Sequence, residues 1–100
     1  MIIRIFRVTV EDGKEAEFED FFLNTALPLV KSQPGIISVT PGLPRPETPN
    51  EFCMVMVWSD VESIKAFAGD NWQLPHIHPD EAGLIRDRAL HHYNLNQLIT

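Results

Sequence analysis

The sequence predicts a single α+β domain in which two helices cover one face of a four-stranded antiparallel sheet. Its 100 residues fit one domain, residues 1–100. Four short segments have the composition or alternation of strands, and two longer segments repeat apolar residues at helical spacing. The predicted order is strand, helix, strand, strand, helix, short helix, strand. Two strand–helix–strand halves around a hairpin make a ferredoxin-like βαββαβ plan.

The first strand and the first helix are predicted from residues 2–34. Residues 2–10 are rich in β-branched side chains, and both alternating sets are mostly apolar, so both faces should be covered. Asp12 followed by Glu15 is typical of a helix start. Pro28 lies inside the apolar stripe of this helix, so we expect a kink near residues 24–28. The stripe consists of Phe18, Phe21, Phe22, Thr25, Ala26, Leu29 and Val30.

The second and third strands form the predicted hairpin, and the second helix follows it. The strands should span residues 36–43 and 51–58, joined by a stiff loop with three prolines at positions 44, 46 and 49. Ser59-Asp60-Val61-Glu62 is a capping box that begins the second helix, which should end at Gly69.

The C-terminal quarter is predicted as an irregular segment, a short helix and a last strand. Residues 70–78 show no clear periodicity, whereas Pro79-Asp80-Glu81 is a good first turn for a short acidic helix to about Arg86. The last strand should run from 89 to 99. Its alternation places His92, Asn94 and Asn96 on one face and His91, Tyr93 and Leu95 on the other, and leaves open which face is inward.

The face of the sheet away from the helices carries apolar residues that a monomer leaves uncovered. A second sheet of the same kind would bury both apolar faces and enclose a lumen between them. A chain of this length also buries a modest share of its unfolded surface by itself, so a partner subunit would help. We therefore expect a homodimer that pairs through its sheet.

Composition and charge exclude several classes of protein. The formal net charge is −6 without any basic stripe, so nucleic acid and anionic membranes are not expected partners. Apolar runs are too short to span a bilayer, and no export signal is recognisable at the start. The single cysteine, Cys53, allows no intramolecular disulfide, so we expect a cytoplasmic protein. No nucleophile elbow, phosphate loop, dinucleotide fingerprint or Cys-x-x-Cys motif is present.

The chain resembles the antibiotic biosynthesis monooxygenase domains of the dimeric α+β barrel superfamily over nearly its full length. The residues that carry the resemblance are Arg4-Ile5-Phe6-Arg7 leading to Asp12-Gly13-Lys14, Pro34-Gly35-Ile36, Trp58-Ser59-Asp60, residues 67–72, and His92-Tyr93. The resemblance implies a pocket between the helices and the sheet, where some members oxidise polycyclic phenols to quinones with dioxygen and without metal or flavin.

Other members of the resembled family cleave haem, which requires an asparagine in the first strand, a tryptophan in the second helix and a histidine about ten residues later. Here the asparagine position carries Phe6, and the tryptophan position falls near Phe67. Of the three positions, only the histidine has a candidate here, His76. The resemblance to this branch is therefore weak.

Residues of one parity in the first and third predicted strands form a candidate binding surface for a small, flat aromatic ligand. Such a surface either lines a substrate pocket or forms plain dimer core, and both alternatives remain open. Arg4 has the same parity and should pair with Glu51 or another strand acid, or else bind a ligand phenolate or carboxylate. Trp72 either caps the ligand or covers the end of the second helix. The candidate substrate-binding residues are Arg4, Phe6, Phe52, Met54, Met56 and Trp72.

Histidines supply the candidate catalytic groups. His92 is a candidate general base and Asn94 a candidate oxyanion donor, with His91 and Tyr93 in those roles if the register is reversed. His76 is a third catalytic candidate. His76-Ile77-His78 also has the spacing of a metal-ligand pair, but without a second diagnostic pair we expect no metal and no cofactor.

Three functional hypotheses follow from these residues and the resemblance. The first is a cofactor-independent monooxygenase that acts on a small phenolic or quinol substrate after a base has formed the phenolate. The second is a non-catalytic module of the same fold that binds a small ligand. The third is an isomerase or decarboxylase that uses the same base without dioxygen.

Overall fold

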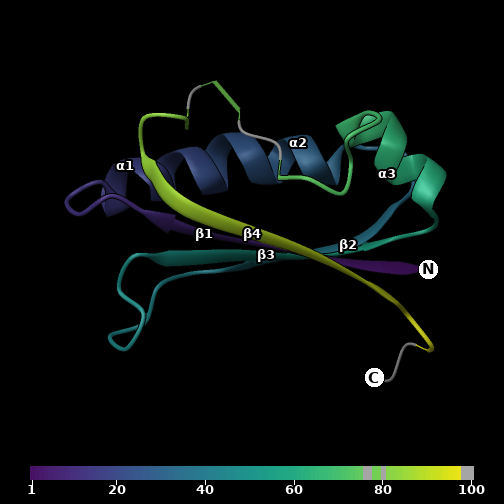
Figure 1. Cartoon of the computed structure of the whole chain (residues 1–100), viewed down its shortest axis with the longest axis horizontal. Helices are drawn as coiled ribbons and strands as arrows, with labels where there is room; N and C mark the ends of the chain where they lie inside the picture. The colour runs from purple at the N-terminus through teal and green to yellow at the C-terminus, as the bar shows by residue number, and fades with distance from the viewer. Residues whose placement is uncertain (76–77, 80, 98–100) are drawn as a thin grey trace.

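The computed structural model describes residues 1–75, 78–79 and 81–97. Its sheet has the strand order β2-β3-β1-β4, with every neighbouring pair antiparallel. The helices lie on one side of this sheet (Figure 1). The strands are β1 (Ile2–Val10), β2 (Ile36–Gly42), β3 (Glu51–Trp58) and β4 (Ile85–Asn94), and the helices are α1 (Glu15–Phe21), the π-helical η1 (Phe22–Ala26), α2 (Leu27–Lys31) and α3 (Val61–Ala68). The predicted α+β, ferredoxin-like plan is confirmed.

The helix-covered face of the sheet holds the core. Strand register places Arg4 opposite both Met56 and His92, and Phe6 opposite both Met54 and Leu90. Side chains of this parity pack against the buried face of the helices, so the alternative that this set forms plain dimer core is wrong. The fully buried members of the core are Val8, Val10, Phe18, Phe52, Trp58 and Ile64.

The first helix continues past Pro28 through the π-helical turn η1, which overlaps the region of residues 24–28 where the sequence predicted an irregularity. Figure 1 shows one continuous helical ribbon from α1 to α2. Leu27 N–H donates to Phe22 O, five residues back, within η1. Proline has no N–H and crowds the carbonyl four residues before it, and the wider turn relieves that conflict. The helix begins after Lys14 without a side-chain cap, so the predicted cap at Asp12 is wrong.

The second helix is capped one residue later than the sequence pattern indicated. The Asp60 carboxylate accepts from Ser63 N–H at 2.8 Å and from the Ser63 hydroxyl at 2.8 Å. The helix ends before Gly69, as predicted.

The predicted short helix before the last strand is wrong. Residues 81–84 form a turn, and β4 begins at Ile85, where Ile85 pairs with Val10 of β1. A helix N-terminus favours exposed acids, but the Glu81 side chain is only 6% exposed and accepts from His78 N–H at 3.2 Å. Long-range pairing with β1 therefore outweighs the local helix signal. The last strand was predicted over 89–99, whereas β4 begins earlier, at Ile85, and ends earlier, at Asn94; residues 98–99 of the prediction lie outside the described residues.

Candidate functional site

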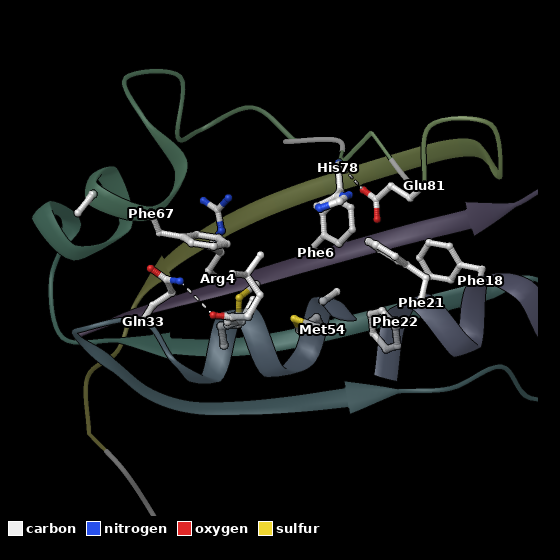
Figure 2. A pocket seen from close by; sticks show the side chains of 15 residues that line it. Arg4, Phe6, Phe18, Phe21, Phe22, Gln33, Met54, Phe67, His78 and Glu81 are labelled. Carbon is white, nitrogen blue, oxygen red and sulfur yellow. Dashed lines mark hydrogen bonds between the residues drawn. The ribbon is translucent and has the colours of Figure 1, made fainter. Parts of the chain in front are cut away.

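A cavity of about 320 Å³ lies between the helices and the covered face of the sheet. Most of its wall is aromatic, aliphatic or thioether, and Figure 2 shows the labelled side chains around it. The volume is at the small end of the range for ligand pockets. The lining residues are Arg4, Phe6, Phe18, Phe21, Phe22, Ala26, Leu29, Val30, Gln33, Met54, Met56, Ala66, Phe67, His78 and Glu81.

Arg4 is the buried cation of this site. It comes from the central strand β1 and is 4% exposed. Its Nη1 donates to Trp72 O at 2.7 Å and contacts His92 Nε2 at 2.8 Å. Burial lowers the pKa of Arg4 to about 10, so the guanidinium is charged at neutral pH. The expected pair with Glu51 is wrong, because Glu51 lies opposite Thr9, whose side chain has the other parity from Arg4 in β1.

His92 holds Arg4 in place. A guanidinium has donors and no acceptor, so Nε2 of His92 accepts and the imidazole is neutral with its proton on Nδ1. Burial is the largest cause that lowers the His92 pKa, followed by the charges of Arg4 and His91. The Trp72 ring meets the imidazole edge-on, with 4.8 Å between centroids. Of the two open registers, the structure places His92 on the helix side and His91 on the opposite face.

Glu81 is a site residue that the sequence analysis missed. Its side chain lines the cavity, and Oε1 accepts from His78 N–H. Burial raises the pKa of the Glu81 carboxyl, while the His78 backbone hydrogen bond and the charges of His78 and Arg88 lower it to a smaller extent. Figure 2 shows Glu81 beside His78 at one end of the cavity. No periodic pattern marked this acid, since it follows Pro79 like an ordinary helix N-terminal residue.

Four of the remaining predicted site residues lie in the core of the molecule, and three of these line the cavity. Phe6, Met54 and Met56 line the cavity together with Arg4. Phe52 does not line it, because its ring packs against Phe18 at 4.8 Å between centroids, deeper in the core.

The other predicted residues lie at or beyond the edge of the site. Trp72 does not line the cavity either, but its carbonyl and ring contact Arg4 and His92. Asn94 shares the parity of His92 and is exposed. His76 lies outside the described residues.

Two further observations concern metals and membranes. Among residues 1–75, 78–79 and 81–97, no three histidine, cysteine or acidic side chains gather as a metal site. In the same part of the chain, no helix has the length and apolar character needed to cross a membrane.

Solved structures with the same fold cover almost the whole chain. A mutant of SnoaB, a cofactor-independent oxygenase from Streptomyces nogalater, is 24% identical with a TM-score of 0.71, over 98% of this chain and 95% of that chain. A mutant of MhuD with two manganese protoporphyrin IX molecules per active site is 18% identical with a TM-score of 0.73, over 100% and 99%. Protein SO0527 from Shewanella oneidensis is 15% identical with a TM-score of 0.76, over 92% and 87%. These similarities establish the fold.

Sequence comparison establishes the family. No curated protein sequence matches the chain. The family model for antibiotic biosynthesis monooxygenase matches residues 1–71, which include β1, β3, all of the helices and most residues that line the cavity. The chain therefore belongs to the antibiotic biosynthesis monooxygenase family.

Proposed function

We propose that the chain is a cofactor-independent monooxygenase that oxidises a small phenolic substrate in the cavity. The observation that carries the proposal is a buried carboxylate, Glu81, inside a wall of aromatic and thioether side chains. Such a wall suits a flat aromatic ring, and the carboxylate can take the hydroxyl proton of that ring. Family membership and the fold shared with SnoaB support the same reaction class.

The chemistry begins with deprotonation. Glu81 removes the phenolic proton, and burial makes it a stronger base than an exposed carboxylate because its pKa is raised. Arg4 lines the same cavity, and its positive charge favours the binding of an anionic ligand there. The resulting phenolate is rich enough in electrons to reduce dioxygen, and the apolar wall keeps competing water away.

The overall step is balanced without a further reactant. One atom of dioxygen forms the new carbon–oxygen double bond at the ring position opposite the phenolate. The carbon–hydrogen bond at that position breaks, the ring is oxidised to a quinone, and dioxygen is reduced. The second oxygen atom leaves as water with that hydrogen and the hydroxyl proton.

His92 and Asn94 take different places in this proposal from those expected of them. We assign the base to Glu81, because Nε2 of His92 already accepts from Arg4 and the imidazole does not line the cavity. His92 instead acts as a positioning residue for the guanidinium. Asn94 is exposed and is given no role.

Haem degradation has no support in the described lining. The position where the haem-degrading branch needs an asparagine carries Phe6, and the tryptophan position falls near Phe67; both phenylalanines line the cavity with hydrocarbon rings. His76, the third position, lies outside the described residues. We derive no step through haem.

We also propose that two copies pair through the uncovered face of the sheet. Ile3 and Ile5 of β1 share this face with Val55 and Tyr93, which are 37% and 53% exposed. Burying such a face is favourable by roughly 25 cal/mol for each Å² of apolar surface. Native mass spectrometry tests the pairing, and a monomer at micromolar concentration would refute it.

Oxygen uptake with a panel of naphthols and anthrols tests the reaction. We expect uptake above the blank and quinone product for at least one compound. Glu81→Gln should lower the rate by about 10²–10⁴-fold, the usual contribution of a general base. Glu19→Gln, an exposed acid of α1, is the matched control and should leave the rate unchanged.

Each negative result has a separate meaning. A panel without any uptake above the blank would refute the monooxygenase and leave a binding module. Uptake that survives Glu81→Gln would refute the assignment of the base. Product formed under anaerobic conditions would instead favour an isomerase or decarboxylase.

A further inference from the structure

Arg4 is a buried cation for which the described part of the chain supplies no acidic partner. The residue is 4% exposed, and no carboxylate of residues 1–75, 78–79 or 81–97 forms an ion pair with its guanidinium. Burying an unpaired charge is costly, and buried arginines normally meet a carboxylate or phosphate. Because Arg4 lines the cavity, the missing anion is expected from the ligand.

The hydrogen bonds of Arg4 leave one edge of the guanidinium free. Nη1 carries two hydrogens, and two acceptors contact it, Trp72 O and His92 Nε2. Nε and Nη2 donate to no acceptor among the described residues. These two nitrogens form one side of the planar group, with a pair of parallel N–H bonds. That edge matches the two oxygens of a carboxylate in a bidentate pair.

We propose that the cavity binds an aromatic carboxylate, with the carboxylate on the Nε–Nη2 edge of Arg4 and the ring against Phe6 and Phe67. The inference deepens the proposed function and rests on it for the identity of the cavity as the substrate site. It makes the substrate an aromatic hydroxy acid instead of a neutral phenol. A phenolate has one oxygen and would leave part of the free edge without an acceptor.

The two ends of the cavity agree with a substrate of this class. Figure 2 shows Arg4 towards the α3 end and Glu81 towards the other end, beyond Phe6. A rigid aromatic acid bound to Arg4 therefore points its far side at Glu81. A hydroxyl on that side meets the proposed base, so one ligand engages both charged groups.

Trp72 and His92 make Arg4 selective for this geometry. Together they hold Nη1, which fixes the plane of the guanidinium and the direction of its free edge. Neutral His92 accepts from Arg4 without adding charge, so Arg4 supplies the positive charge that meets the carboxylate at this end of the cavity.

Isothermal titration with 2-naphthoate and 2-naphthamide tests the proposal at pH 7.5 on the full chain. The two compounds share the ring, and only 2-naphthoate is an anion. We expect 2-naphthoate to bind at least about tenfold more tightly, as charge-assisted hydrogen bonds usually provide. Equal affinity, tighter binding of the amide, or no binding of either compound would overturn the proposal.

Variants of two arginines on the same strand locate the preference. Arg4→Met should abolish the preference for the acid, while Arg4→Lys, which keeps the charge and loses the fork, should retain only part of it. Arg7→Met is the control, because Arg7 is exposed and has the opposite parity in β1. A preference that survives Arg4→Met would overturn the proposal. If Arg4→Met does not fold, the comparison of the two ligands on the unmodified chain still decides it.

Oxygen uptake with hydroxynaphthoates separates this inference from the proposed reaction. Preferred binding of the acid without any uptake would refute the monooxygenase and keep the ligand class. Uptake with naphthols but no preference for the acid would keep the monooxygenase and refute the carboxylate.

Discussion

Replacing Gly35 by alanine should destabilise the fold far more than the same change at Gly13. Both glycines have positive φ, 88° and 83°, in the region that L-residues avoid. A Cβ at Gly35 would lie well inside van der Waals contact of Ser63 Oγ and Cβ, and 3.1 Å from Ser59 Oγ. A Cβ at Gly13 would meet nothing within 4 Å. The pair therefore separates steric overlap from backbone strain.

The expected magnitudes follow from these surroundings. The left-handed backbone costs an alanine about 1–2 kcal/mol at either position, and the lower entropy of the unfolded alanine chain returns about 0.4–1 kcal/mol. Overlap with a packed helix adds about 1–3 kcal/mol at Gly35 alone. We expect a loss of about 0–1.5 kcal/mol for Gly13→Ala and about 1–4.5 kcal/mol for Gly35→Ala.

Urea denaturation at a fixed protein concentration measures the difference, because pairing of two chains would make stability depend on concentration. Ser63→Gly removes both overlapping atoms, so it should recover much of the loss in the Gly35→Ala background. Losses that agree within about 0.5 kcal/mol for the two glycines, with no recovery, would refute the close approach of Gly35 to α3.

Three further predictions concern Glu81, His92 and the open face of the sheet. Glu81→Gln should raise the free energy of unfolding at pH 7 by about 0.5–2 kcal/mol, the usual range for removing a destabilising group. Burial raises the Glu81 pKa, so this gain in stability should disappear below the ordinary value of 4.5, where Glu81 is protonated in both the folded and the unfolded state. Denaturation from pH 4 to 8 measures the gain. A gain that does not change with pH would contradict burial of the Glu81 carboxyl as its cause. Burial lowers the His92 pKa, so as the pH falls through the ordinary value of 6.5 the imidazole is protonated in the unfolded chain before it is in the folded chain. The free energy of unfolding should therefore decrease as the pH falls through this range. In the same measurement, His92→Gln should make this decrease shallower. Val55→Glu, on the open face of the sheet, should shift native mass spectra from dimer to monomer. Leu74→Glu is the control, because Leu74 is 61% exposed in the segment after α3, and it should leave the spectrum unchanged. A dimer in both variants would exclude the open face of the sheet as the interface.

Local patterns predicted the elements whose signals lie within a few residues. β1 and β3 occur where β-branched and apolar residues were dense, and α3 ends before the glycine that was expected to stop it. Parity also grouped Arg4, Phe6 and Met54 on one face, and they line one cavity. Alternation along a strand has a period of two whatever the strand pairs with, so this grouping needs no tertiary information.

Signals that depend on distant partners were misread. Pro79 and Glu81 have the local features of a helix start, but pairing of Ile85 with Val10 draws the next segment into the sheet and buries Glu81. The turn at Phe22–Ala26 depends on which hydrogen bond replaces the one that Pro28 cannot make. Neither outcome is encoded in the spacing of apolar residues.

The sequence by itself determined the order of the four strands and the two main helical segments, the family and the set of side chains that share each face. The tertiary structure decided which face the helices cover, and it brought Arg4 to His92 and Trp72 across 88 and 68 positions of the chain. The physical reason is the register of β4 on β1, since a shift by one residue would exchange His92 for His91. A candidate base at Glu81 and a free guanidinium edge at Arg4 exist only once these distant segments meet.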